Sequence, residues 1–505
     1  MITASSPETL AASSPAEATP TGFRVGRAPL PYVLVERAPG GALFVERGGF
    51  GGRPAYVRCE RDVALVGTDL TWVVERSRAL GLTLTHDPDR LASACLLEAG
   101  PAGLTQTSYR EISEVPPGTR AEVAPGRLTL TQLSPPRDPG ERAGLVSRAD
   151  LVDRLRAHLF ASLERAIEGA ASVGVLTGGG LDSGALLAMA HALGPRTNAF
   201  AIDFGGPGDD RPHLVALARA LGIEPVRVTP DAAPLPVALT AAGMPLTWPS
   251  GAAEAQLLVR AREWGASRVL AGLGADQWFD GDPASVTFAR AMRHALLRNV
   301  PWSVRRLLRR RVRPRVPAWA GPRAKRLLVE SHERALDARP SSATSPDERI
   351  RAAFFDPHLA LASTLRLQLE RLSGVLRVDP YLDAELATFA LALPPRELLG
   401  APGASARRGL FREALRGVLP ESVRMRTDKA SFAPVHRALF RAPLLARLAP
   451  YAGAARLADL GIIEPRAFRR AFDAEVDASP RSPPDARIYA TLAVEAFLDG
   501  SEGGV

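Results

Sequence analysis

Cysteine is almost absent from this chain: among 505 residues there are two, Cys59 and Cys95. They form no CxxC pair and no cluster with histidine, which argues against structural zinc and against a disulfide-stabilised secreted scaffold. The length instead predicts two or more domains that bury cores of their own. So few cysteines are typical of a protein in a reducing compartment, and we expect cytoplasmic localisation.

Lysine is equally scarce, although the net charge is +9. Lys325 and Lys429 are the only lysines, so arginine supplies nearly all of the positive charge. This bias weakens the case for a nucleic-acid partner, and we expect none. The densest basic run, Arg305–Arg315, favours a solvated face. If it binds a ligand, an acidic peptide, a nucleotide phosphate and nucleic acid remain open.

Long apolar runs are missing as well. No stretch of about eighteen apolar residues occurs, so no membrane span is predicted. Residues 1–22 are small and polar, and they lack the basic and apolar segments of a signal peptide. We therefore expect a disordered tail over residues 1–22.

Short alternating stretches fill residues 23–133 and predict a β-rich domain. The predicted strands are Tyr32–Glu36, Ala42–Glu46, Ala55–Arg58 and Val63–Gly67, and a hairpin turns at Pro125-Gly126. A stretch rich in Pro, Gly and charge follows, and we assign residues 134–149 to a linker.

Strands alternate with helices from residue 150, which predicts an α/β domain with a doubly wound parallel sheet over 150–497. Leu151, Leu155, Leu159 and Leu163 recur at helical spacing. The predicted strands are Ser172–Leu176, Asn198–Ile202, Pro225–Val228 and Arg268–Ala271, with helices at Ala185–Leu193, 209–221 and 252–264. Beyond about residue 285 the pattern is mostly helical.

The loop VLTGGGLDSG, Val175–Gly184, lies between a predicted strand and a helix. Glycines there let backbone N–H groups approach a phosphate, and a helix N-terminus favours the anion. A Walker loop would need a lysine after the glycines, and a dinucleotide loop would need a third glycine where Ser183 stands. Asp182 would repel a pyrophosphate unless a cation lay between them, so the loop suits ATP with Mg²⁺.

A second loop, GLGADQWFDG or Gly272–Gly281, follows the strand at 268–271. By itself its Asp276 could be an ordinary helix cap. In a parallel sheet, however, the carboxyl ends of the strands share one edge, where ligands bind. We therefore expect Asp182 and Asp276 to face each other across one Mg²⁺ ion.

These motifs together resemble the asparagine synthetase-like family. GGGLDS at 178–183 is similar to its pyrophosphate loop, PYLDAELATFALALP at Pro380–Pro394 to its PFLD segment, and RTDKASF at Arg426–Phe432 to its lysine-bearing segment. The resemblance implies an Ntn-type, glutamine-amidotransferase-like β-sandwich followed by an ATP-pyrophosphatase domain of the adenine nucleotide alpha hydrolase kind. It implies ATP and Mg²⁺ as cofactors. The nucleotide-binding residues that it implies are Thr177, Gly178, Gly179, Gly180, Leu181, Asp182, Ser183, Gly184, Ile202, Gly272 and Gly274.

Departures from that family narrow the expected reaction. Position 2 is Ile2 rather than the cysteine of glutamine-hydrolysing members, so we expect an inactive amidotransferase domain. The β-lactam-forming branch uses a Tyr and a Glu where this chain has Leu273 and Leu376. GVLRVDPYLD, Gly374–Asp383, looks more like the lasso peptide cyclase branch. Small-molecule amide synthesis, asparagine synthesis and a non-catalytic binder remain the alternatives.

The lasso reading implies a precursor peptide as substrate, and a separate leader-binding protein and leader peptidase as partners. Asp182, Asp276 and Lys429 are its expected catalytic residues, with the two aspartates as metal ligands. Lys429 also stands out without the family, because a lysine kept in an arginine-rich chain suggests a site that needs a compact ammonium.

Overall fold

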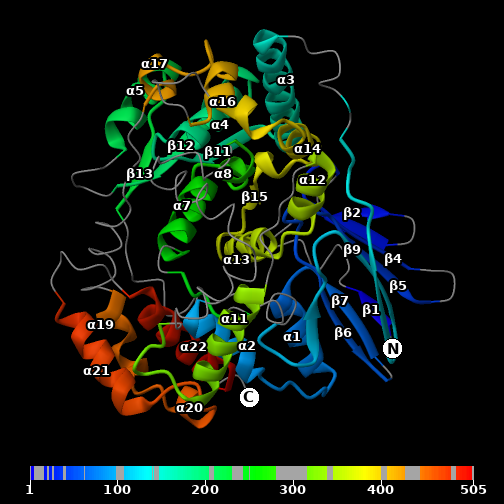
Figure 1. Cartoon of the computed structure of the whole chain (residues 1–505), viewed down its shortest axis with the longest axis vertical. Helices are drawn as coiled ribbons and strands as arrows, with labels where there is room; N and C mark the ends of the chain where they lie inside the picture. The colour runs from blue at the N-terminus through cyan, green and yellow to red at the C-terminus, as the bar shows by residue number, and fades with distance from the viewer. Residues whose placement is uncertain are drawn as a thin grey trace.

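Three β-sheets form the framework of the part of the chain that the computed structural model describes (Figure 1). The described residues are 2–4, 16–19, 22–25, 28–37, 41–61, 63–97, 107–138, 140, 147–203, 210–229, 243–248, 251–279, 315–337, 345–399, 407–426, 444–478 and 485–502.

The first two sheets come from the N-terminal part and share one apolar core. The four-stranded sheet has the order β1 (Ile2–Ala4), β7 (Val63–Gly67), β6 (Tyr56–Glu60), β8 (Ile112–Glu114). The six-stranded sheet has the order β10 (Arg127–Gln132), β9 (Thr119–Ala124), β5 (Leu43–Arg47), β4 (Val33–Arg37), β3 (Gly22–Val25), β2 (Ala16–Thr19). Alternate residues such as Val35 and Val45 of one sheet meet Val57 and Val66 of the other in a single buried cluster.

For this part, one expectation is wrong and another is incomplete. Residues 1–22 are not disordered throughout, because β1 pairs parallel with β7 and β2 pairs antiparallel with β3. Backbone pairing at an open sheet edge does not need apolar side chains, so composition does not reveal it. The β-rich prediction also omits two helices, α1 (Leu70–Ala79) and α2 (Pro88–Leu96), which Asp69 and Asp87 cap.

The third sheet is the predicted parallel one. Its order is β13 (Val226–Val228), β12 (Arg196–Ile202), β11 (Ser172–Leu176), β14 (Arg268–Leu270), β15 (Leu376–Val378), and every neighbouring pair is parallel. The fifth strand, β15, lies in the region that the sequence predicts to be mostly helical. Its three residues carry a charged side chain, Arg377, at a buried position, so the hydrophobic pattern of a strand is lost.

Helices cover both faces of the parallel sheet. One face packs against α7 (Gly251–Glu263), whose Leu258 shares a core with Phe200. The opposite face packs against α3 (Arg148–Ile167), α4 (Leu181–Ala192) and α5 (Arg211–Leu221). The sheet is therefore doubly wound, as the alternation of strands and helices predicts.

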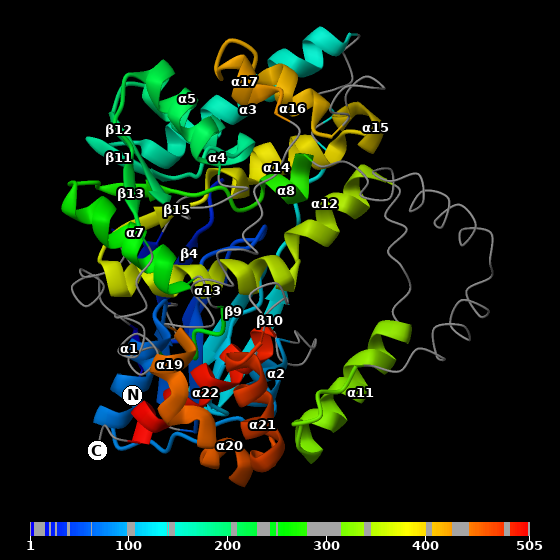
Figure 2. The same ribbon diagram turned by 90° about the vertical axis from the view of Figure 1, so that its left-hand side faces the viewer.

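The remaining helices form two groups: α8 and α12–α17 lie near the parallel sheet, whereas α11 and α19–α22 gather around α2. They are α8 (Ala275–Phe279), α11 (Pro322–Asp337), α12 (Pro346–Phe354), α13 (Pro357–Ser373), η3 (Pro380–Leu382), α14 (Ala384–Ala392), α15 (Pro395–Leu398), α16 (Gly409–Ala414), α17 (Glu421–Arg424), α19 (Leu445–Leu448), η5 (Ala449–Gly453), α20 (Ala455–Asp459), α21 (Pro465–Val476) and α22 (Ala486–Glu502). Figure 2 shows α13 running between the parallel sheet and the N-terminal strands.

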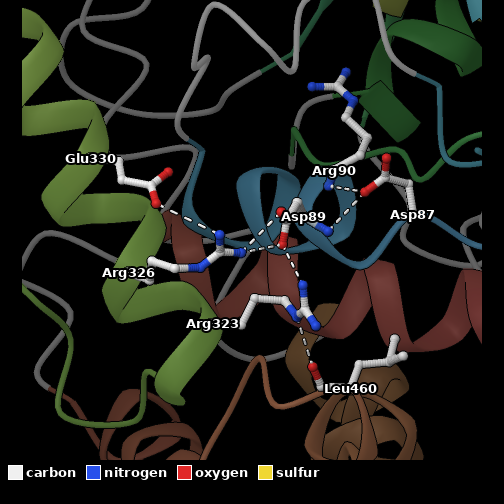
Figure 3. A network of polar contacts seen from close by, with 7 residues as sticks. All are labelled: Asp87, Asp89, Arg90, Arg323, Arg326, Glu330 and Leu460. Carbon is white, nitrogen blue, oxygen red and sulfur yellow. Dashed lines mark hydrogen bonds and ion pairs between the residues drawn. The ribbon is translucent and has the colours of Figure 1, made fainter.

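Contacts between distant parts of the sequence fix this arrangement. The C-terminal helix α22 lies against α2, and the rings of Tyr109 and Phe497 meet edge to face. On the other side of α2, Asp89 accepts hydrogen bonds from Arg323 and Arg326 of α11 (Figure 3). These three side chains are 34–51% exposed, so we assign the ion pairs an orienting role rather than a large contribution to stability.

Candidate functional site

The glycine loop 177–180 connects β11 to α4 at the carboxyl edge of the parallel sheet. No side-chain hydrogen bond caps α4, which begins after Gly180. The first backbone N–H groups of such a helix have no partner within the helix, and together with its dipole they favour an anion. The loop therefore has the backbone arrangement that the sequence predicts for phosphate binding.

Gly179 gives the loop its shape. Its φ is +99°, and an added Cβ would lie 2.4 Å from the backbone nitrogen of Leu214. Gly178 is different, because a Cβ there would meet only Asp210, at 3.6 Å. Thr177 links the two ends of the loop. Its Oγ1 accepts from the N–H of Gly179 and lies 2.9 Å from Oγ of Ser183.

Residues 271–275, at the start of the second loop, lie beside the glycine loop. A Cβ on Gly272 would be 3.8 Å from Cβ of Asp182, so the two segments are in contact. Tyr381, which is fully buried, links them: its hydroxyl donates to the carbonyl of Asp182, and its own carbonyl accepts from Nε1 of Trp278 in α8. The expected meeting of the two motifs is confirmed.

Asp182 and Asp276 both pair with the side chain of Arg408. The guanidinium of Arg408 donates from one nitrogen to Asp182 and from the other to Asp276. Arg408 is 10% exposed, whereas the side chains of Asp182 and Asp276 are 24% and 54% exposed. Both carboxylates therefore reach the same positive charge, with one side of the arrangement open to solvent.

Further arginines surround the glycine loop. Arg426 donates to the carbonyl of Gly179 at 3.0 Å and to Oδ1 of Asp210 at 2.6 Å, and its side chain is 4% exposed. Burial, and after it the nearby charge of Arg408, lowers the pKa of Arg412. Sequence reasoning missed Arg408, Arg412 and Arg426 as site residues, because in an arginine-rich chain one more arginine carries no signal.

The other expected residues fall into three groups. Ile202 lies at the end of β12, and Gly184 lies in the first turn of α4, against Leu217. The side chain of Leu181 points into the core, so only its backbone is available to a ligand. Lys429 and residues 305–314 of the arginine run lie outside the described residues.

Asp182 and Asp276 fit a magnesium site of the kind that phosphates complete. No group of three or more histidine, cysteine or carboxylate side chains within the described ranges could hold a metal alone. Mg²⁺ commonly uses one or two carboxylates together with substrate phosphates. Asp182 and Asp276, which lie close enough to pair with the same arginine, match that donor set.

A glycine loop, two carboxylates and buried arginines at the carboxyl edge of a doubly wound sheet define a nucleotide-binding α/β protein. The sequence profile of asparagine synthase matches residues 154–498, which include the whole of this site. The chain thus belongs to the asparagine synthase family, whose members are ATP-dependent ligases that typically use Mg²⁺.

One further comparison and one feature of the helices complete this description. The search of curated proteins gave no match. In the described part of the chain, no helix has the length and apolar character needed to cross a membrane.

The first prediction concerns the glycine loop. Gly179→Ala is expected to lower the free energy of unfolding by about 2 kcal/mol or more, because alanine is strained at this φ and meets backbone. Gly178→Ala is the matched control and should change it by less than about 0.5 kcal/mol. Urea unfolding of both variants measures this. Equal losses at the two glycines would contradict the loop geometry.

Proposed function

We propose that this protein is an ATP-dependent lasso peptide cyclase. It adenylates an Asp or Glu side chain of a precursor peptide and joins that side chain to the peptide's N-terminal amine. The observation that supports the adenylation step is that Asp182 and Asp276 both pair with Arg408 beside the glycine loop. The choice of a peptide substrate rests on the sequence of Gly374–Asp383 and on leucine at positions 273 and 376.

The glycine loop and its arginines hold the triphosphate in this proposal. Backbone N–H groups at the start of α4 donate to phosphate oxygens, while Arg426 keeps Gly179 in place from behind. Asp182 and Asp276 would hold Mg²⁺, which supplies charge neutralisation at the phosphates. Arg408 lies between the same carboxylates and adds a fixed positive charge at this edge of the loop.

Two bond exchanges complete the reaction. A carboxylate oxygen of the peptide attacks the α-phosphorus of ATP, and the bond to the bridging oxygen breaks, so pyrophosphate leaves. The amine then attacks the acyl carbon, loses a proton and displaces AMP. Lys429 is assigned to the developing oxyanion. Closing a ring of about eight or nine residues costs loop entropy, which peptide binding must offset.

The N-terminal sheets have a structural role in this proposal. Cys95 lies in the core, and burial raises the pKa of its thiol. Cys59 donates to the carbonyl of Ala124, and burial raises its pKa as well. These raised pKa values support a structural rather than a nucleophilic role for both thiols, since nucleophilic cysteines have lowered pKa values. A leader-binding protein and a leader peptidase are the partners that we propose.

A second candidate function is small-molecule amide synthesis in the manner of the β-lactam-forming enzymes. The same adenylation site serves it equally well. Leucine at positions 273 and 376 argues against it, because an apolar pair cannot take a proton from the amine.

The products of ATP cleavage give the second prediction. Incubated with ATP, Mg²⁺ and its precursor core peptide, the protein should release AMP and pyrophosphate in equal amounts. The peptide should lose the mass of one water molecule. Coupled pyrophosphate detection and mass spectrometry measure both, with a peptide lacking Asp and Glu as control. Release of ADP and orthophosphate would exclude adenylation.

The third prediction concerns the two carboxylates. Asp182→Asn and Asp276→Asn should each remove pyrophosphate release, because the amide cannot replace the charge that a divalent cation requires. Asp203→Asn is the control, because Asp203 follows β12 at the same sheet edge but pairs with Arg211 and Arg227. Activity in both site variants like that of Asp203→Asn would remove the metal assignment.

Lys429 provides the fourth prediction. Lys429→Ala should reduce product formation by about 10²–10³-fold, the usual cost of one lost oxyanion donor. Lys429→Arg should also fail, because a guanidinium keeps the charge but not the compact geometry. Lys325→Arg, at the only other lysine of the sequence, should retain wild-type turnover. Full activity of Lys429→Arg would show that Lys429 acts as an ordinary cation.

A further inference from the structure

A buried arginine, Arg377, stands at the centre of β15 among carboxylates from three elements. Its side chain is 3% exposed. It donates to both carboxylate oxygens of Asp379, at 3.2 and 3.1 Å, and to Glu254 of α7. Its backbone N–H donates to Oε1 of Glu370 at 2.8 Å. A buried charge costs several kcal/mol unless it is paired in this way, so the position demands a cation.

Asp379 connects Arg377 to the second loop of the nucleotide site. Its Oδ1 also accepts from the backbone N–H of Leu273 at 3.2 Å, and Asp379 is 6% exposed. The preceding amide in this ladder, that of Ala271, donates to the carbonyl of Val378 at 3.0 Å. A side-chain carboxylate thus continues the β14–β15 pairing into the loop, three residues before Asp276.

In the opposite direction the network reaches the N-terminal sheets. The second oxygen of Glu370 accepts from Arg53 at 2.6 Å, and the two side chains are 3% and 11% exposed. A separate contact nearby joins Arg47 of β5 to Glu114 and to Thr364 of α13. Arg47 is 1% exposed, and its hydrogen bonds go to Glu114, to Thr364 and to backbone carbonyls, so we use it as the control position.

We propose that Arg377 is a positioning residue for the nucleotide site. Acting through Asp379, it fixes the amide of Leu273 and thereby the place of Asp276 relative to Asp182. Arg53 and Glu370 anchor this arrangement to the N-terminal part, which gives that part a role in adenylation. The role assigned to Asp276 rests on the proposed function, whereas the hold on Leu273 does not.

The physical reason lies in the charges around Arg377. Without a well-placed guanidinium, the buried Asp379 and the partly buried Glu254 lose their shared cation and repel one another. Asp379 can then leave the amide of Leu273 to gain solvation. Lysine keeps the charge of Arg377 but cannot make its forked contacts. A small shift of Asp276 suffices to weaken a metal that demands near-ideal octahedral geometry.

The fifth prediction compares Arg377→Lys with Arg47→Lys. Both replace a buried arginine that joins carboxylates, and both should lower the melting temperature. Hydrogen exchange followed by mass spectrometry should show faster exchange, by about tenfold or more, at residues 271–275 in Arg377→Lys alone. In magnesium titrations with ATP as the probe, Arg377→Lys should raise the half-saturating Mg²⁺ concentration about five- to tenfold. Arg47→Lys should leave it unchanged.

Asp379→Asn provides a second variant if Arg377→Lys does not fold. Asparagine can still accept from Leu273 but pairs weakly with Arg377, so exchange at residues 271–275 should rise by a smaller factor. Unchanged exchange in both variants, or an equal rise in Arg47→Lys, would overturn the proposal. Wild-type protein that does not bind ATP with Mg²⁺ would contradict the proposed function alone, because the exchange measurement needs no nucleotide.

Discussion

The position of β14 between β11 and β15 is the constraint on which the site depends. Val173 of β11 pairs with Arg268, and Leu270 pairs with Val378 of β15, all in parallel. Because parallel strands end at the same edge, the glycine loop after β11, the loop after β14 and the Asp379 carboxylate after β15 come together. Tyr381 then joins the first two through hydrogen bonds of its own. Residues nearly 200 positions apart in the sequence thus form one site.

Arginine performs nearly every cationic task in this protein. Arg377 and Arg408 each span two carboxylates, which the planar fork of a guanidinium allows and an ammonium does not. Arg426 holds a carbonyl and a carboxylate together behind the glycine loop. Such buried pairs contribute specificity of position more than net stability, because desolvation offsets much of their attraction. Their placement around one sheet edge ties the site to the core and to the N-terminal sheets.

The sequence alone determined the class of the fold and the two loops that meet at the candidate site. The alternation of strands and helices predicted the parallel sheet, and the glycines with Asp182 and Asp276 predicted a phosphate loop facing a second carboxylate. Both motifs are local, because a strand, a turn that needs glycine and the start of a helix lie within about ten residues. The sequence pattern therefore predicts them directly.

Only the tertiary structure decided the rest. The sequence pattern did not predict β15 because its central residue is charged. Burial of that charge depends on Asp379, two residues along, and on Glu254, which is 123 positions away. Arg408 acquired its role from two carboxylates that lie 226 and 132 positions away. β1 and β2 pair through backbone groups, which every sequence offers equally. A buried ion pair or an added edge strand forms only when two distant segments meet, so the sequence of either segment alone does not predict it.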